Sequence, residues 1–191
     1  MNTNPYVILT LCLMPFTFFL LAAEQPNIIY ILADDMGYGD VAANNPNCKF
    51  PTPFLDQLAE EGMRFTDAHT NSSVCTPTRY GILTGRYSWR THLKGGVLDG
   101  AAGPLIPSDR TTVATFLKKQ GYKTACVGKW HLGMSWPTKD GKKPVRSRGD
   151  NIDFTQPIAN GPNHVGFDYY YGISASLNMP PHAYIQNRRI N

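Results

Sequence analysis

Two adjacent carboxylates, Asp34 and Asp35, directly follow an apolar run near the start of the chain. Like charges side by side repel each other, so burying the pair is unfavourable unless a cation lies between them. A hard divalent cation with oxygen ligands removes that cost, and the glycines that follow let the backbone bring both carboxylates to one ion. The pattern predicts a metal site, and the alternative is a helix cap beside a solvated aspartate.

Cys75 stands just before a short helix, because Pro77 favours a helix start and Gly85 follows the apolar residues that end at Leu83. Arg79 lies four residues after Cys75, which is one helical turn, so its guanidinium can lie beside the cysteine. The positive end of the helix and the arginine together favour an anion at this position. Cys75 is therefore a candidate nucleophile, and the alternative is a buried structural cysteine.

Lys129 and His131 lie in a glycine-flanked segment, residues 128–133 (GKWHLG). Two residues apart in an extended segment, their side chains project to the same side. The alternatives are a solvated loop charge for Lys129 and a hydrogen-bonded structural imidazole for His131.

Strands and helices alternate around these residues. We expect a buried strand over residues 27–33, a second over 63–68 and a third over 122–127, each rich in apolar or β-branched residues. Alternation with helices favours a parallel α/β sheet, whose functional loops follow the carboxyl ends of the strands. Asp34, Asp35 and the 128–133 segment fall at such ends.

Two longer helices are predicted between the strands. One begins at Thr52 and Pro53 and ends at Gly62, and the other is capped by Ser108 or Asp109 and runs to Gln120. The residues expected to face inward are Phe54, Leu55, Leu58 and Ala59 in the first helix, and Val113, Phe116 and Leu117 in the second.

Taken together, these segments resemble the type I, formylglycine-dependent sulfatase family. Residues 75–79 (CTPTR) with 83–86 (LTGR) are similar to its C-x-P-x-R and L-T-G-R signature, and 27–35 and 128–133 resemble two further motifs in the expected order. Residues 166–172 (GFDYYYG) are similar to secreted bacterial arylsulfatases. The resemblance implies an alkaline-phosphatase-like α/β fold, a mostly parallel sheet flanked by helices, incomplete at the C-terminal side.

The resemblance also implies an activity, hydrolysis of a sulfate monoester carried by a small molecule or a glycan. A formylglycine-generating maturation enzyme would oxidise Cys75 to Cα-formylglycine. One hydroxyl of the hydrated aldehyde would attack the sulfur, and the other would let the covalent ester collapse, an exit that a serine lacks.

Roles for other residues follow from the resemblance. Asp34 and Asp35 would hold Ca²⁺ or Mg²⁺ in contact with residue 75. Arg79 would orient the formylglycine hydroxyls. Three residues remain: Lys129 and His131, which would offset charge on the sulfuryl group, and Ser176, which would contact substrate.

The family completes its site with later residues, an Asp and an Asn or Gln for the metal and a further His and Lys near the sulfate. None can be assigned in this sequence. We therefore expect residues 24–191 to be the N-terminal part of a sulfatase catalytic domain, and to be inactive alone.

Composition indicates which partners are excluded and where in the cell the protein is expected. The 191 residues carry a net charge of +4, a surplus too small to indicate nucleic-acid binding. Residues 6–23 are uncharged and end in Ala22 and Ala23, which predicts a signal peptide over 1–23 and an exported protein, periplasmic or secreted, with no stable membrane anchor. The alternative is an uncleaved anchor.

Cys48 and Cys126 either form a disulfide or are small buried side chains.

Two other functions compete with the sulfatase hypothesis. One is a phosphate or phosphonate ester hydrolase of the same superfamily, against which Cys75, Pro77 and Arg79 argue because those relatives generally use Thr or Ser. The other is an inactive homologue that binds sulfated glycans. Conversion of the Cys75 thiol to an aldehyde would separate the sulfatase from both.

Overall fold

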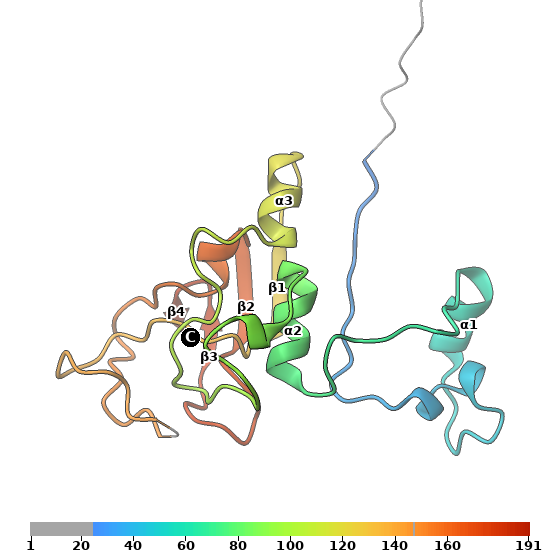
Figure 1. Cartoon of the computed structure of the whole chain (residues 1–191), viewed down its shortest axis with the longest axis horizontal. Coiled ribbons are helices and arrows are strands. Elements are labelled where there is room, and N and C mark those ends of the chain that lie inside the picture. Colours follow the sequence, from blue (N-terminus) through green and yellow to red (C-terminus); the bar gives the residue numbers. More distant parts are fainter. Residues whose placement is uncertain (1–24, 147) are drawn as a thin grey trace, which may run out of the picture. The chain divides into compact units, whose positions relative to one another are not determined.

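The structure is a computed structural model that describes residues 25–146 and 148–191 (Figure 1). It divides into two compact units, residues 1–36 and 37–191, each of which is described by itself. The predicted signal peptide over residues 1–23 lies outside the described residues. Among the helices of the described ranges, none has the length and apolar character needed to cross a membrane.

The described part of the first unit, residues 25–36, forms neither helix nor strand. The buried strand predicted over 27–33 is wrong, since Ile29 and Ile31 are 84% and 83% exposed. A strand exists only where a neighbour takes up its backbone hydrogen bonds, and no strand of the described residues pairs with this run. Asp34 and Asp35 form an exposed turn at its end.

The second unit begins with two 3-10 turns, η1 (Tyr38–Asp40) and η2 (Ala42–Asn44), and helix α1 (Pro53–Glu61). The predicted helix is confirmed, with Thr52 and Gly62 at its two caps. Its apolar side is exposed rather than buried, and Phe54 is 84% exposed. Residues 63–68 form no strand, so that prediction is wrong.

Helices α2 (Cys75–Thr84) and α3 (Val113–Lys119) follow, with the 3-10 turn η3 (Ser88–Arg90) between them. Helix α2 begins at Cys75 rather than at Pro77, because Val74 takes the N-cap position and its carbonyl accepts the Thr78 N–H at 3.2 Å. It ends at Gly85, as predicted, with a left-handed φ of 66°.

Helix α3 starts later than predicted. Its N-cap is Thr112, not Ser108 or Asp109, and the Thr112 hydroxyl accepts the Thr115 N–H at 3.1 Å while the Thr112 N–H donates to the Thr115 hydroxyl at 2.8 Å. This reciprocal pair fixes the start of the helix. The inward face is also different, since Ala114 is buried whereas Val113 and Phe116 are exposed.

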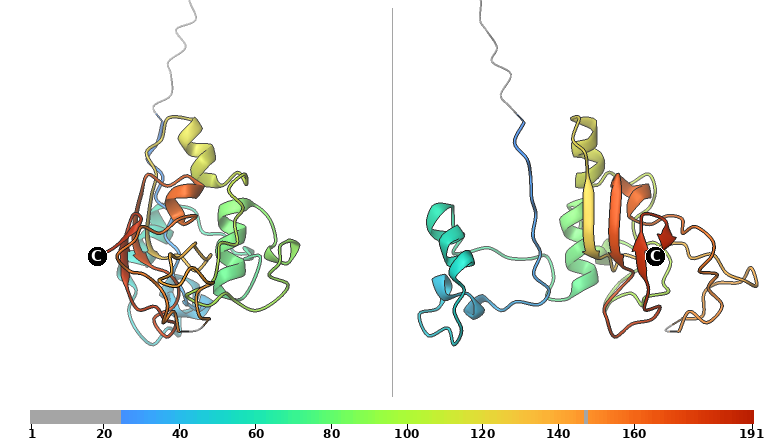
Figure 2. Two further views of the ribbon diagram at one scale, coloured as in Figure 1. Left: turned by 90° about the vertical axis from the view of Figure 1, so that its left-hand side faces the viewer. Right: turned by 180° about the vertical axis from the view of Figure 1, so that it is seen from behind.

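A four-stranded sheet forms the centre of the second unit (Figure 2). Its strands, in spatial order, are β1 (Ala125–Lys129), β2 (Tyr169–Ile173), β3 (Tyr184–Gln186) and β4 (Arg189–Ile190), and the 3-10 turn η4 (Pro162–Val165) precedes β2. Strands β1 and β2 are parallel, whereas the other two pairings are antiparallel. The strand predicted over 122–127 is present but lies at 125–129. The sheet was expected to be mostly parallel, whereas only the β1–β2 pairing of the described residues is parallel.

One face of the sheet packs on the core. Tyr170 and Ile185 are almost completely buried, while Val127 on the opposite face is 74% exposed. Gly128 and Gly172 are paired in the register, and a Cβ on Gly172 would lie 1.7 Å from the Gly128 carbonyl oxygen. The absence of a side chain at position 172 therefore allows β1 and β2 to approach each other.

Candidate active site

Cys75 is the first residue of α2 and is half-buried. Side chains tie the preceding loop to the helix: the Asn71 amide donates to the Pro77 carbonyl at 2.8 Å, and the Thr78 hydroxyl donates to the Ser72 carbonyl at 2.8 Å. The helix N-terminus carries the positive end of the helix dipole. These hydrogen bonds hold the backbone at Cys75 in place, and the helix dipole favours a negative charge on its side chain.

Arg79 extends from α2 to the sheet. Its guanidinium donates a hydrogen bond to the carbonyl of Lys129, the last residue of β1. Burial raises the pKa of the nearby Cys126 thiol to about 11, and the positive charge of Arg79 acts in the opposite direction. Burial also raises the pKa of Tyr170, again against the Arg79 charge. Arg79 thus holds a positive charge between α2 and the inner face of the sheet.

Cys126 projects to this same face of β1 as a free thiol, and Cys48 is free as well. Of the two alternatives that the sequence left open, the disulfide is not formed. A protonated thiol behaves as a small apolar side chain, and the half-buried Cys126 packs in this way against the core that contains Tyr170.

Lys129 is the last residue of β1, and His131 lies two residues further along the chain. The parallel pairing continues past the strand, since the Trp130 N–H donates to the Ile173 carbonyl at 3.0 Å and the His131 N–H to the Ser174 carbonyl at 2.9 Å. Lys129 is half-buried, whereas His131 is completely buried.

The predicted same-side projection of these two residues rests on an extended backbone through His131. The extended run ends at Lys129, and His131 has a φ of 55°, a left-handed conformation that costs a non-glycine residue about 1–3 kcal/mol. Trp130, between the two, is 3% exposed and stacks edge-to-face on Phe167 and Tyr170. The His131 ring is completely buried, with Nε2 at 2.7 Å from the Leu98 carbonyl. A carbonyl only accepts hydrogen bonds, so this contact requires the proton on Nε2.

The structure thus brings four predicted residues to the carboxyl ends of β1 and β2 or to the helix that reaches them: Arg79, Lys129, His131 and Ser176. Ser176 is half-buried and follows β2, and its carbonyl accepts the Met179 N–H at 2.9 Å. Cys75 is connected to this group through α2, one helical turn before Arg79.

Asp34 and Asp35 belong to the first unit, where both are exposed. Their carboxylates are donors of the kind that Ca²⁺ and Mg²⁺ prefer, but two carboxylates provide only part of the six to eight oxygen ligands typical of Ca²⁺. No group of three or more His, Cys, Asp or Glu side chains within residues 25–146 and 148–191 is arranged to hold a metal ion.

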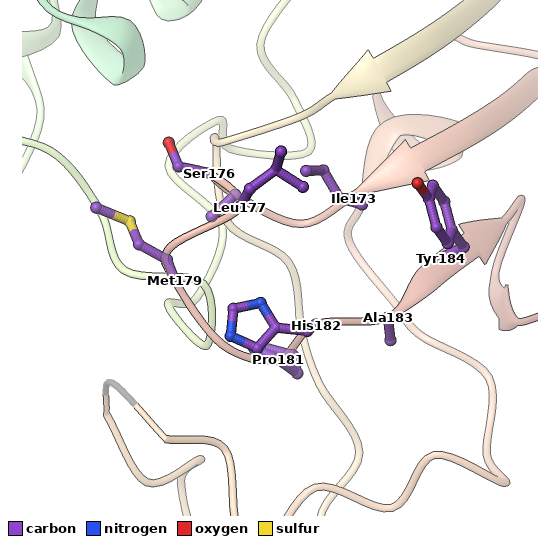
Figure 3. Close-up of a pocket in the computed structure, with 9 residues that line it drawn as sticks. Ile173, Ser176, Leu177, Met179, Pro181, His182, Ala183 and Tyr184 are labelled. Carbon is purple, nitrogen blue, oxygen red and sulfur yellow. The ribbon is translucent and has the colours of Figure 1, made fainter.

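A pocket that the sequence analysis did not identify lies where β2 ends (Figure 3). Its volume is about 110 Å³. Apolar and aromatic walls come from Ile173, Leu177, Met179 and Tyr184, and the polar side chains are those of Ser176 and His182. The loop over residues 174–183 carries no periodic pattern, so no local signal indicates that its residues surround a cavity.

Comparison with known proteins identifies the family of the chain. The sulfatase family profile matches residues 26–188. The chain is 38% identical over 168 residues to an N-acetylgalactosamine-6-O-sulfatase of Bacteroides thetaiotaomicron, covering 88% of this chain and 30% of the relative. It is 48% identical over 163 residues to arylsulfatase A of Bos taurus, covering 85% of this chain and 28% of the relative.

A solved structure from work on the metabolism of multiple glycosaminoglycans by Bacteroides thetaiotaomicron superposes with a TM-score of 0.76 at 37% identity. The match covers 88% of this chain and 32% of that one. The fold is therefore the α/β fold of solved sulfatases, and the chain spans about 30% of the length of the relatives it matches. Because the family profile covers most of the sequence, the chain belongs to the sulfatase family.

Proposed function

We propose that the full-length protein hydrolyses sulfate monoesters, with a sulfated sugar as its substrate class. The observation that carries this proposal is the connection from Cys75 through Arg79 to Lys129: Arg79, one helical turn after the signature cysteine, donates to the backbone carbonyl of Lys129 at the carboxyl end of β1. Support for a sulfated sugar comes from the 38% identical N-acetylgalactosamine-6-O-sulfatase.

Cys75 is, in this proposal, the precursor of a Cα-formylglycine made by a formylglycine-generating enzyme. The hydrated aldehyde supplies a nucleophilic hydroxyl and a second hydroxyl for release of the product. The chain's own contribution is to hold residue 75 at the start of α2, half-buried, with the helix dipole and Arg79 favouring negative charge beside it.

Lys129, His131 and Ser176 act on the sulfate ester in this scheme. Lys129 offsets the negative charge that develops on the sulfuryl oxygens. His131 holds a proton on Nε2 against the Leu98 carbonyl, which makes Nδ1 the nitrogen that accepts a hydrogen bond or takes up a proton. Ser176 contacts the substrate from the end of β2.

Asp34 and Asp35 would hold the Ca²⁺ or Mg²⁺ ion. Such an ion polarises sulfate oxygens when it is bound. The two carboxylates match the hard-cation chemistry, and further oxygen ligands would be needed to complete the coordination.

The test uses the full-length gene product expressed with a formylglycine-generating enzyme, and assays N-acetylgalactosamine 6-sulfate and 4-nitrophenyl sulfate. We expect turnover by the native sequence and a loss of kcat of at least about 10³-fold in Cys75→Ala and Cys75→Ser, as for removal of other catalytic nucleophiles. Equal turnover by native protein and Cys75→Ala would contradict the proposal. The same assay on residues 24–191 alone tests the expectation that this segment is inactive.

A further inference from the structure

The pocket at the end of β2 lies beside the candidate catalytic residues. Ile173, which forms part of its wall, is the register partner of Lys129, and adjacent strands lie about 4.8 Å apart. The hydrogen bond from the His131 N–H to the Ser174 carbonyl fixes this neighbourhood beyond the strand ends. A sulfate held at Lys129 would therefore place the alcohol part of its ester next to the pocket.

We propose that this pocket holds the sugar ring of the sulfate ester, and that His182 selects the sugar by hydrogen bonding to its hydroxyl groups. The inference rests on the proposed function and extends it to a specificity-determining residue. At about 110 Å³ the pocket is smaller than the roughly 300–1,000 Å³ of sites that enclose drug-sized ligands, so it would receive one side of a single ring rather than enclose a longer chain.

The lining matches the chemistry of a pyranose. Such a ring has C–H faces that pack on apolar and aromatic surfaces, and hydroxyl groups around its edge. Leu177, Met179 and Tyr184 supply the apolar surface, and Tyr184 is held by stacking on Tyr171, with ring centroids 5.7 Å apart and planes 11° from parallel. His182 is the only ionisable side chain apart from the Tyr184 phenol among the described residues that line the pocket.

The loop that carries His182 is well supported. Two consecutive prolines, Pro180 and Pro181, precede it and fix φ at two positions. The Pro180 carbonyl packs so closely on Gly100 that a Cβ there would lie 2.2 Å from its oxygen. His182 itself is exposed, and Figure 3 shows its ring beside Pro181 on the loop between β2 and β3. A fixed loop with an exposed imidazole is suited to recognising a ligand without reorganisation.

The experiment compares native protein, His182→Ala and His182→Gln in the matured full-length gene product. The substrates are N-acetylgalactosamine 6-sulfate, which has ring hydroxyls, and 4-nitrophenyl sulfate, which has none. We expect His182→Ala to raise KM for the sugar about five- to tenfold, the effect of losing one neutral hydrogen bond, with kcat/KM for the aryl sulfate unchanged. His182→Gln, which retains hydrogen-bonding groups, should recover part of the loss.

His164→Ala is the matched control, because His164 is an exposed histidine in η4, before the opposite end of β2. It should leave both substrates unaffected. The proposal is overturned if His182→Ala leaves the KM for the sugar unchanged, or weakens both substrates equally.

Failure of the proposed function gives a different result, namely no turnover of either substrate by native protein. In that case calorimetric titration of N-acetylgalactosamine 6-sulfate into the full-length Cys75→Ala variant still tests the pocket. Binding that weakens about five- to tenfold when His182→Ala is added supports the inference, and binding that is absent or unchanged overturns it.

Discussion

The Arg79 guanidinium has two consequences at the scale of single residues. It donates a hydrogen bond to the Lys129 carbonyl, and it places a positive charge beside the buried Cys126 and Tyr170 side chains. A planar guanidinium can make several directed hydrogen bonds at once, whereas a lysine ammonium is a compact point charge on a flexible stem. Arg79 therefore acts on both the position of α2 and the charge of the site.

We predict that Arg79→Ala lowers the free energy of unfolding by about 1.5–3 kcal/mol, the range for a hydrogen bond to a charged group. Arg79→Lys should be less destabilising but should still lower kcat, because the charge is kept while the directed bond to Lys129 is lost. Urea denaturation and kinetics on the full-length product measure the two effects. Arg90→Lys, an exposed arginine in η3, is the control. If Arg79→Lys behaved like Arg90→Lys in both assays, the connecting role of Arg79 would be wrong.

The spacing of site residues within one element could be predicted from the sequence better than the orientation of their side chains. The spacing of Cys75 and Arg79 indicated one helical turn, which the structure confirms. The position of His131 could not be predicted, because its contacts are with the carbonyls of Leu98 and Ser174, which lie far away in the sequence. His182 carried no signal either, since a single histidine in a loop shows its surroundings only when β2 and β3 pair around it.

At the scale of elements, the site depends on how closely β1 and β2 approach. Their register sets Lys129 beside Ile173, so that in the proposed function a sulfate at Lys129 would lie beside the pocket. The paired glycines Gly128 and Gly172 permit this approach, because no Cβ fits between the Gly172 Cα and the Gly128 carbonyl.

We predict that Gly172→Ala destabilises the protein by about 1–3 kcal/mol or more, the cost of forcing extra atoms into a packed interior, and lowers activity by displacing Lys129 from Ile173. Gly103→Ala is the matched control, since a Cβ at Gly103 meets nothing within 4 Å. The urea concentrations at the unfolding midpoints of the two variants test this prediction. Equal midpoints would show that β1 and β2 can move apart without loss of stability, and would contradict it.

Local sequence signals explain which elements could be predicted. Proline at the first position and glycine after the last gave α1 its bounds, because these are properties of the helix itself. The strands over 27–33 and 63–68 were wrong, because a strand depends on a partner that no local pattern reveals. Helix α3 was placed too early because the Thr112 and Thr115 pair, not the earlier Ser108 or Asp109, supplies the cap.

At the scale of the whole molecule, the family is shown by a match that spans residues 26–188, whereas the chain spans 30% and 28% of the lengths of two relatives. Its reaction is therefore a property to be measured on the full-length gene product. Large apolar side chains such as Ile29, Phe54 and Val127 are more than 70% exposed, and such surfaces commonly mark places where other protein segments bind.

The most direct test of the account is mass spectrometry of the peptide that contains Cys75, from full-length protein made with and without a formylglycine-generating enzyme, with sulfatase activity measured on the same samples. The account predicts an aldehyde at position 75 in the first sample, a thiol in the second, and turnover in proportion to the aldehyde. Full turnover by protein that retains its thiol at position 75 would contradict it.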